Sequence, residues 1–241
     1  MKHIIFLMVL LSSLLFSEKM LSEIQKNGLT LIKADKTTLI IKRETNPLCT
    51  KDNINPHSLF GGNYAGEKIA SACKKSFVTK VGVLQPMTLA KEIKTLGELE
   101  VLAHIQKSNT NPKTHILIDA RTVQWYEQMI IPTAVNLPFD KISYDEDLEE
   151  DDFEHLDEFE VYTENYLEMF KILNIKQTKR GLDFSKAKSA VFYCNGSWCS
   201  QSPNAIFKLI NIGYPKEKLL WYRGGLQDWL IYDFTVEKPK R

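Results

Sequence analysis

Short apolar runs alternate with segments of helical period over the C-terminal two-thirds of the chain. The runs at 115–120 (HILIDA) and 188–194 (KSAVFYC) are typical of buried strands, and an apolar stripe over 96–105 predicts a helix. The other predicted elements are a short helix at 122–129, a strand at 134–139, an amphipathic helix at 162–175, a helix at 202–214, and a strand, glycine turn and short helix over 218–230. This alternation predicts an α/β fold with a mostly parallel sheet flanked by helices.

Three polar features follow predicted strands. Asp119 ends one strand, Cys194 follows a second, and the turn at 223–225 (Arg-Gly-Gly) follows a third. Because sites in parallel sheets form at the carboxyl ends of strands, we expect these features to meet at one edge. In the helix after the cysteine loop, Ser202 is the predicted N-cap and Pro203 the first helical residue.

The N-terminal part has a different pattern. Residues 1–18 carry a positive charge at Lys2 and then about 13 apolar residues, too few to span a bilayer and typical of a secretory signal. Residues 19–85 predict a small strand-rich unit, with a hairpin formed by 29–32 and 38–41. We therefore expect an exported protein, periplasmic or secreted, with its main domain at 86–241. An uncleaved anchor stays open, because no cleavage site stands out.

Composition limits the classes of partner that we expect. The 241 residues have a net charge of +1, which gives no reason to expect nucleic acid or, beyond the signal segment, a membrane. The one strong local bias is the acidic stretch at 145–160. A solvated face is the simple interpretation of such a run, and an acidic docking surface is the alternative.

The four cysteines separate into two pairs. In an oxidising compartment Cys49 and Cys73, both in polar turn-like segments, predict a disulfide. Cys194 and Cys199 share one loop, but their spacing fits neither the two close pairs of a zinc site nor the Cys-x-x-Cys redox motif. We predict no metal and no cofactor.

The setting of Cys194 favours a nucleophile. It lies between a buried strand and a helix N-terminus, where loop amides and the helix dipole stabilise anions. This predicts a lowered pKa for its thiol and a pocket for an anionic group. Cys199 is then a helper, a resolving thiol or a bystander.

Residues 96–231 resemble a rhodanese-like domain. The resemblance rests on Asp119-Ala120-Arg121, on the segment 131–138 (IPTAVNLP), on Cys194 opening a loop, and on Gly-Gly-x-x-x-Trp at 224–229. It implies a sulfurtransferase in which Cys194 carries sulfane sulfur as a persulfide. The acceptor would be a small nucleophile or a thiol, including a protein thiol.

The resemblance also assigns supporting roles. Asp119 and Arg121 would buttress the catalytic loop, and its amides would hold the persulfide. The implied substrate-binding residues are Asn195, Gly196, Ser197, Trp198, Cys199, Ser200 and Gln201.

Two departures from the family pattern leave a second hypothesis open. The loop is longer than usual and has no basic residue, which disfavours the dianion thiosulfate and argues against phosphatase chemistry. It also contains the additional Cys199. An exported sulfurtransferase is therefore weighed against a thiol–disulfide redox or partner-docking module built on the same scaffold.

Overall fold

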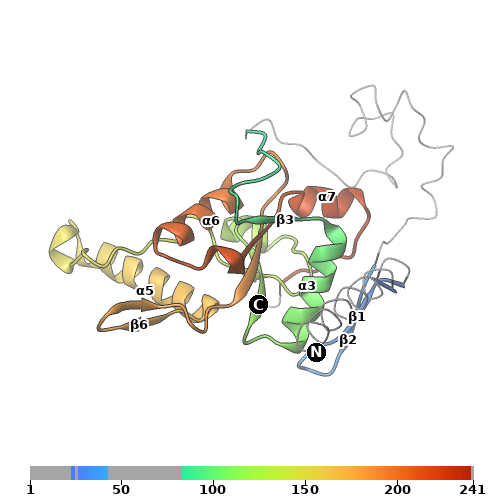
Figure 1. The fold of residues 1–241 in the computed structure, drawn as a ribbon, viewed down its shortest axis with the longest axis horizontal. Coiled ribbons are helices and arrows are strands. Elements are labelled where there is room, and N and C mark those ends of the chain that lie inside the picture. The colour runs from blue at the N-terminus through green and yellow to red at the C-terminus, as the bar shows by residue number, and fades with distance from the viewer. Residues whose placement is uncertain (1–22, 25–26, 43–82, 240–241) are drawn as a thin grey trace, which may run out of the picture.

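The computed structural model describes residues 23–24, 27–42 and 83–239 (Figure 1). The predicted signal segment at 1–18 and the predicted Cys49–Cys73 disulfide lie outside these residues. None of the described helices is long and apolar enough to cross a bilayer.

A parallel sheet of five strands organises the domain, in the order β3-β9-β8-β4-β5. The strands are β3 (Lys94–Leu96), β4 (His115–Asp119), β5 (Val135–Asn136), β8 (Ser189–Tyr193) and β9 (Leu219–Tyr222). The central strand β8 is almost completely buried. The predicted α/β architecture is confirmed.

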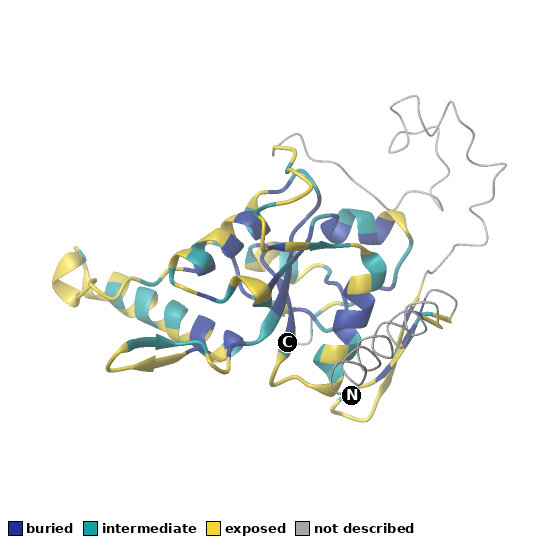
Figure 2. Ribbon diagram, viewed as in Figure 1, coloured by how far each residue is buried: buried dark blue, intermediate teal, exposed yellow. Residues whose placement is uncertain are grey.

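Helices pack on both faces of this sheet, and Figure 2 shows its strands largely in the dark blue of buried residues. They are α3 (Glu98–Thr110), α4 (Val123–Tyr126), α5 (Leu156–Leu173), α6 (Gln201–Asn211) and α7 (Gly225–Ile231), with 3-10 turns at Glu150–Asp152 and Lys216–Lys218. Successive side chains of a strand point to opposite faces. Accordingly Phe192 packs in the core under α5 and α6, while Val191 and Tyr193 pack in the core under α3 and α7.

The predicted N-terminal hairpin is present as β1 (Leu29–Ile32) and β2 (Thr38–Ile41), paired antiparallel. Alternate side chains, Leu29 and Leu31, are buried and join the core that contains α3. The hairpin thus closes one face of the sheet domain. The boundary near residue 85 between two units stays a prediction.

Some local predictions were wrong. Leu96 ends β3 and does not begin the helix, because α3 starts after Gly97. The helix α6 begins at Gln201, so Ser202 lies inside its first turn and is not the N-cap. A hairpin of β6 (Lys176–Thr178) and β7 (Gly181–Asp183) was missed, since its short polar strands carry no apolar alternation.

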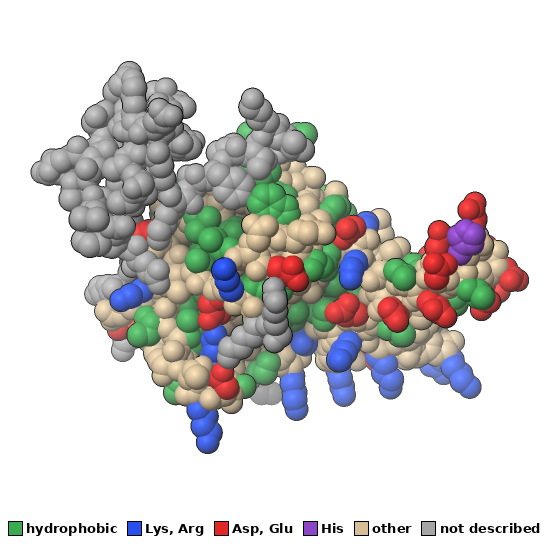
Figure 3. Space-filling model, turned by 180° about the vertical axis from the view of Figure 1, so that it is seen from behind, with side chains coloured by type: hydrophobic (Ala, Val, Ile, Leu, Met, Phe, Trp, Pro, Cys, Tyr) green, Lys and Arg blue, Asp and Glu red, His purple; other side chains and the backbone are tan. Residues whose placement is uncertain are grey.

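The acidic stretch at 145–160 runs through the 3-10 turn into the start of α5 and is mostly exposed. Figure 3 shows its acidic side chains gathered on an arm that projects from the domain. A row of aromatic contacts stiffens this arm, including Tyr162 against Tyr166 and Tyr166 against Phe170. The exposure agrees with a solvated face; the docking role stays a prediction.

Candidate active site

The carboxyl ends of three strands meet at one edge of the sheet, as expected. Tyr193 of β8 is in register with Asp119 of β4 on one side and with Tyr222 of β9 on the other. Cys194 follows Tyr193 directly. It therefore lies between the segment that follows β4 and the segment that follows β9. Asp119, Cys194 and the glycine turn are therefore brought together.

A chain of hydrogen bonds ends on the sulfur of Cys194. The indole Nε1 of Trp221 donates to Ser202 Oγ at 3.1 Å, and Ser202 Oγ donates to Cys194 Sγ at 3.1 Å. The Cys194 thiol in turn points to the carbonyl oxygen of Cys199, with a sulfur–oxygen distance of 3.5 Å. Cys194 is 2% exposed and Ser202 is completely buried. Ser202 was missed as a site residue because its sequence position favours a helix cap.

Cys199 lies beside Cys194 and is also buried, and neither cysteine is in a disulfide. Its thiol points to Oε1 of Gln201, with a sulfur–oxygen distance of 3.7 Å. Its pKa is lowered to about 7, chiefly by a hydrogen bond from the Cys194 thiol and further by the backbone amides of Gln201 and Asn195 and the charge of Arg121. These interactions favour the thiolate form of Cys199.

The predicted lowering of the Cys194 pKa was wrong. Burial raises the pKa of this thiol well above its usual range, and the hydrogen bond and negative charge of Cys199 raise it further. Ser202 acts in the opposite direction, through its hydroxyl and its amide. The physical reason is that two neighbouring thiols in one buried loop hold one negative charge between them, and the better-solvated member takes it.

A buried ion pair supports the loop from below. Arg121 donates from Nε and Nη2 to Asp119 Oδ2, at 3.1 and 2.6 Å, and from Nη2 to the carbonyl of Met129 at 2.6 Å. Its Nη1 reaches Asn195 Oδ1 at 3.4 Å, and Tyr193 donates to Asp119 Oδ2 at 2.8 Å.

All three nitrogens of the guanidinium therefore have protein partners. Burial alone would lower the pKa of Arg121, but its hydrogen bond and ion pair with Asp119 raise it, so the side chain stays charged. Because Arg121 is 1% exposed, the geometry agrees with a buttress.

The second support comes from α7. Leu226 and Gln227 donate their amides to the carbonyls of Cys194 and Asn195, at 2.9 and 2.8 Å. This close approach requires Gly225, which has φ of +60° and no room for a side chain. Trp198 donates from Nε1 to Gln227 Oε1 at 2.6 Å, so the indole is anchored to the same helix.

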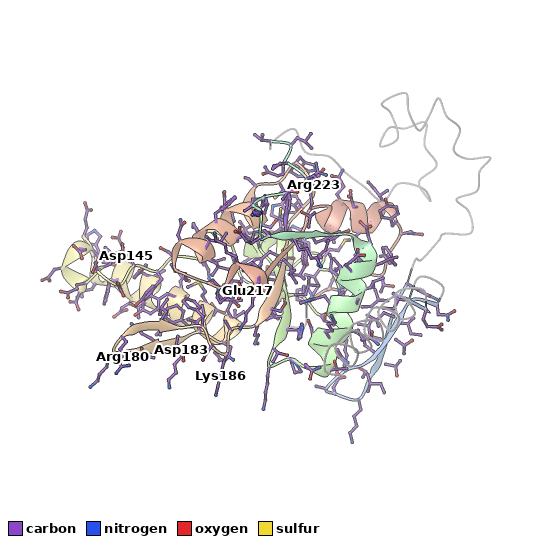
Figure 4. All side chains as sticks on the ribbon, viewed as in Figure 1. Asp145, Arg180, Asp183, Lys186, Glu217 and Arg223 are labelled. Carbon is purple, nitrogen blue, oxygen red and sulfur yellow. The ribbon has the colours of Figure 1, made fainter. Side chains whose placement is uncertain are left out.

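Residues just before the sheet domain cross the outer side of the loop. Gln85 donates its amide to the carbonyl of Ser197 at 2.8 Å. Arg223, labelled in Figure 4 beside this segment, donates from Nη2 and Nε to the carbonyls of Gln85 and Pro86, at 3.0 and 3.2 Å. Next to it lies an open cavity of about 920 Å³ lined in part by Met87, Arg223 and Tyr232.

The predicted substrate-binding residues are thus together, but several are already engaged within the protein. Asn195 and Trp198 have side-chain partners, and Ser197 has a backbone partner. Residues 195–201 contain no basic side chain. No cluster of three or more His, Cys, Asp or Glu side chains suited to a metal occurs among the residues that the structure describes.

Several solved structures resemble this chain. They include the BH2092 protein of Bacillus halodurans (21% identity, 60% of this chain and 76% of that one, TM-score 0.38) and a rhodanese with anions from E. coli (18%, 52% and 98%, 0.30). A thiosulfate sulfurtransferase from Pseudomonas aeruginosa is 15% identical over 63% of this chain and 21% of its own, with a TM-score of 0.37. No curated protein matches.

The model of the Rhodanese-like domain family matches residues 100–231, which is more than half of the chain. The matched segment begins in α3 and ends with α7. It therefore includes the Asp119–Arg121 pair, the whole cysteine loop and the glycine turn. The chain belongs to the rhodanese-like domain family.

Proposed function

We propose that this protein is a sulfurtransferase that carries sulfane sulfur as a persulfide on Cys194. The observation that carries the proposal is the position of Cys194, which follows the central strand and receives a hydrogen bond from Ser202. A buried hydroxyl that donates to sulfur stabilises both a thiolate and a persulfide anion. The family membership of the chain agrees with this chemistry.

The hydrogen bond from Ser202 supplies the means of activation. The Cys194 thiol loses its proton to solvent, and the Ser202 hydroxyl donates to the thiolate that remains. The Cys194 thiolate then attacks the outer sulfur of a donor of the type R–SO₂–S⁻. The sulfur–sulfur bond forms on Cys194, and the sulfinate R–SO₂⁻ leaves with its electron pair.

The charge of the loop selects the donor class. With no basic residue at 195–201 and Arg121 buried in an ion pair with Asp119, a dianion is held by backbone amides and hydroxyls alone. We therefore expect monoanionic or neutral donors, such as organic thiosulfonates and organic persulfides, to react faster than thiosulfate.

Mass spectrometry of the tryptic peptide 189–208 tests the proposal. This peptide contains both Cys194 and Cys199 and neither of the other cysteines. Reduced full-length protein is treated with sodium benzenethiosulfonate, and the Cys199→Ser variant isolates the first step. A gain of one sulfur, about 32 Da, that disappears in Cys194→Ser supports the proposal. Absence of the gain in Cys199→Ser contradicts it and favours a docking module.

We also propose that residues 1–18 direct export, so that the protein works outside the cytosol with a thiol acceptor. The apolar segment at 4–16 is the support. Cell fractionation and N-terminal sequencing of the isolated protein test this. Recovery in the cytosol with an intact N-terminus contradicts it.

A further inference from the structure

Two free thiols occupy the inside of one loop, and the persulfide chemistry of Cys194 does not require the second. Cys199 is nevertheless 5% exposed and held by the loop itself. Its amide donates to the carbonyl of Gly196 at 2.9 Å, which turns the chain back toward Cys194. Its own carbonyl then lies 3.5 Å from Cys194 Sγ.

The sulfur of Cys199 faces polar atoms of the loop. Its thiol points to Oε1 of Gln201, with a sulfur–oxygen distance of 3.7 Å, and its backbone carbonyl reaches Cys194 Sγ. An attacking group must be deprotonated, and the pKa of Cys199, lowered to about 7 chiefly by the hydrogen bond from Cys194, agrees with this role.

We propose that Cys199 is a resolving thiol that converts the Cys194 persulfide into a Cys194–Cys199 disulfide and free sulfide. The inference rests on the proposed function, because it begins from the loaded Cys194. The protein would then have a second activity besides sulfur transfer, which is the reduction of sulfane sulfur to sulfide.

The step balances without any added oxidant. Loading leaves a persulfide anion on Cys194 and a neutral thiol on Cys199. The proton of Cys199 passes to the outer sulfur, and the Cys199 thiolate attacks Cys194 Sγ. The new bond joins the two cysteine sulfurs, the bond to the outer sulfur breaks, and HS⁻ leaves with that electron pair. The two cysteines are oxidised and the sulfane sulfur is reduced.

The resulting disulfide must be reduced before another cycle. The co-reactant is a dithiol of the thiol–disulfide exchange class, which regenerates both cysteines and leaves as its own disulfide. Sustained release of sulfide therefore needs a dithiol, whereas a single turnover needs only the sulfur donor.

A single-turnover experiment on the reduced full-length chain under anaerobic conditions tests this. Benzenethiosulfonate is a suitable probe because its leaving group is a sulfinate, so any sulfide must come from the transferred sulfur. Sulfide is trapped with monobromobimane, and the peptide 189–208 is weighed after alkylation. We expect one sulfide per chain and a peptide that has lost two hydrogens. The Cys199→Ser and Cys199→Ala variants should retain the added sulfur and release no sulfide.

The outcomes separate the two proposals. If the wild type retains the added sulfur on Cys194 and releases no sulfide, the resolving role is wrong and the sulfur carrier stands. If neither Cys199 variant gains sulfur, the carrier proposal fails and the resolving role fails with it. A protein incubated without donor controls for stray oxidation, and circular dichroism confirms that each variant is folded.

Discussion

Gly225 lies against the backbone of the cysteine loop, where a Cβ would come within 2.4 Å of the carbonyl oxygen of Cys194. The same Cβ would be 2.8 Å from the amide nitrogen of Gly196, and φ at Gly225 is +60°. Both contacts are with backbone atoms of a loop that Arg121 also holds from the other side. The glycine turn therefore sets the position of Cys194.

We expect Gly225→Ala to lower the free energy of unfolding by at least about 2 kcal/mol and to displace the loop. Gly213→Ala is the matched control, because Gly213 also has a positive φ, but its Cβ would meet only a side-chain carbon of Phe184 at 3.5 Å. In the control, the free energy of unfolding should fall by about 1 kcal/mol and persulfide formation should be unchanged. Denaturant unfolding and the peptide assay measure both effects. If the two variants lose equal amounts of unfolding free energy, the steric clash at Gly225 does not explain the effect.

Ser202 should accelerate loading of Cys194. Removing its hydroxyl with Ser202→Ala deletes the hydrogen-bond donor to the developing thiolate, a contribution of roughly 1.5–3 kcal/mol, so persulfide formation should slow at least about tenfold. Its pH profile should move to higher pH, because the pKa of Cys194 rises further. The Trp221→Phe variant, which leaves the hydroxyl in place, should slow the step less. If the pH profile of Ser202→Ala is unchanged, Ser202 has only a structural role.

Arg121 should contribute mainly to the stability of the fold and not to substrate binding. In Arg121→Met the buried carboxylate of Asp119 loses its partner, and we expect a loss of about 3–5 kcal/mol in the free energy of unfolding. Arg223→Met is the control, since Arg223 is partly exposed and its hydrogen bonds go to backbone carbonyls of the crossing segment and not to a buried carboxylate. If Arg121→Met folds as stably as the wild type but binds donor poorly, the arginine contacts substrate and is not a buttress.

Much of this arrangement could be predicted from the sequence, because it depends on patterns that survive without coordinates. Apolar alternation indicated the parallel sheet, and parallel strands alone bring Asp119 and Cys194 to one edge. What could not be predicted depends on side-chain packing inside the loop. The pKa of Cys194 is raised by its burial and then by its hydrogen bond with Cys199, which lowers the pKa of Cys199, and the role of Ser202 arises because α6 starts one residue before it.

Thr133 is a strained position that substitution should relieve. It has φ of +71°, which a β-branched residue rarely adopts, and its buried hydroxyl has no hydrogen-bond partner. Thr133→Gly should raise the free energy of unfolding by about 1 kcal/mol, or Tm by about 2–4 °C. Thr122→Gly is the control, because φ of −59° suits threonine there and the change should destabilise. A lower Tm in Thr133→Gly would contradict the interpretation that the backbone at Thr133 is strained.

The reactivity of Cys199 should depend on pH through its contact with Cys194. Since only the thiolate is alkylated, the rate at Cys199 should rise about tenfold per pH unit below its pKa of about 7 and level off above it. In Cys194→Ala the hydrogen-bond donor is lost, so the pKa should rise and the midpoint should move to higher pH. Iodoacetamide labelling of the peptide 189–208 from pH 5 to 9 measures both curves. A midpoint that does not move in Cys194→Ala means that the amides of Asn195 and Gln201, and not the Cys194 thiol, hold the charge at Cys199.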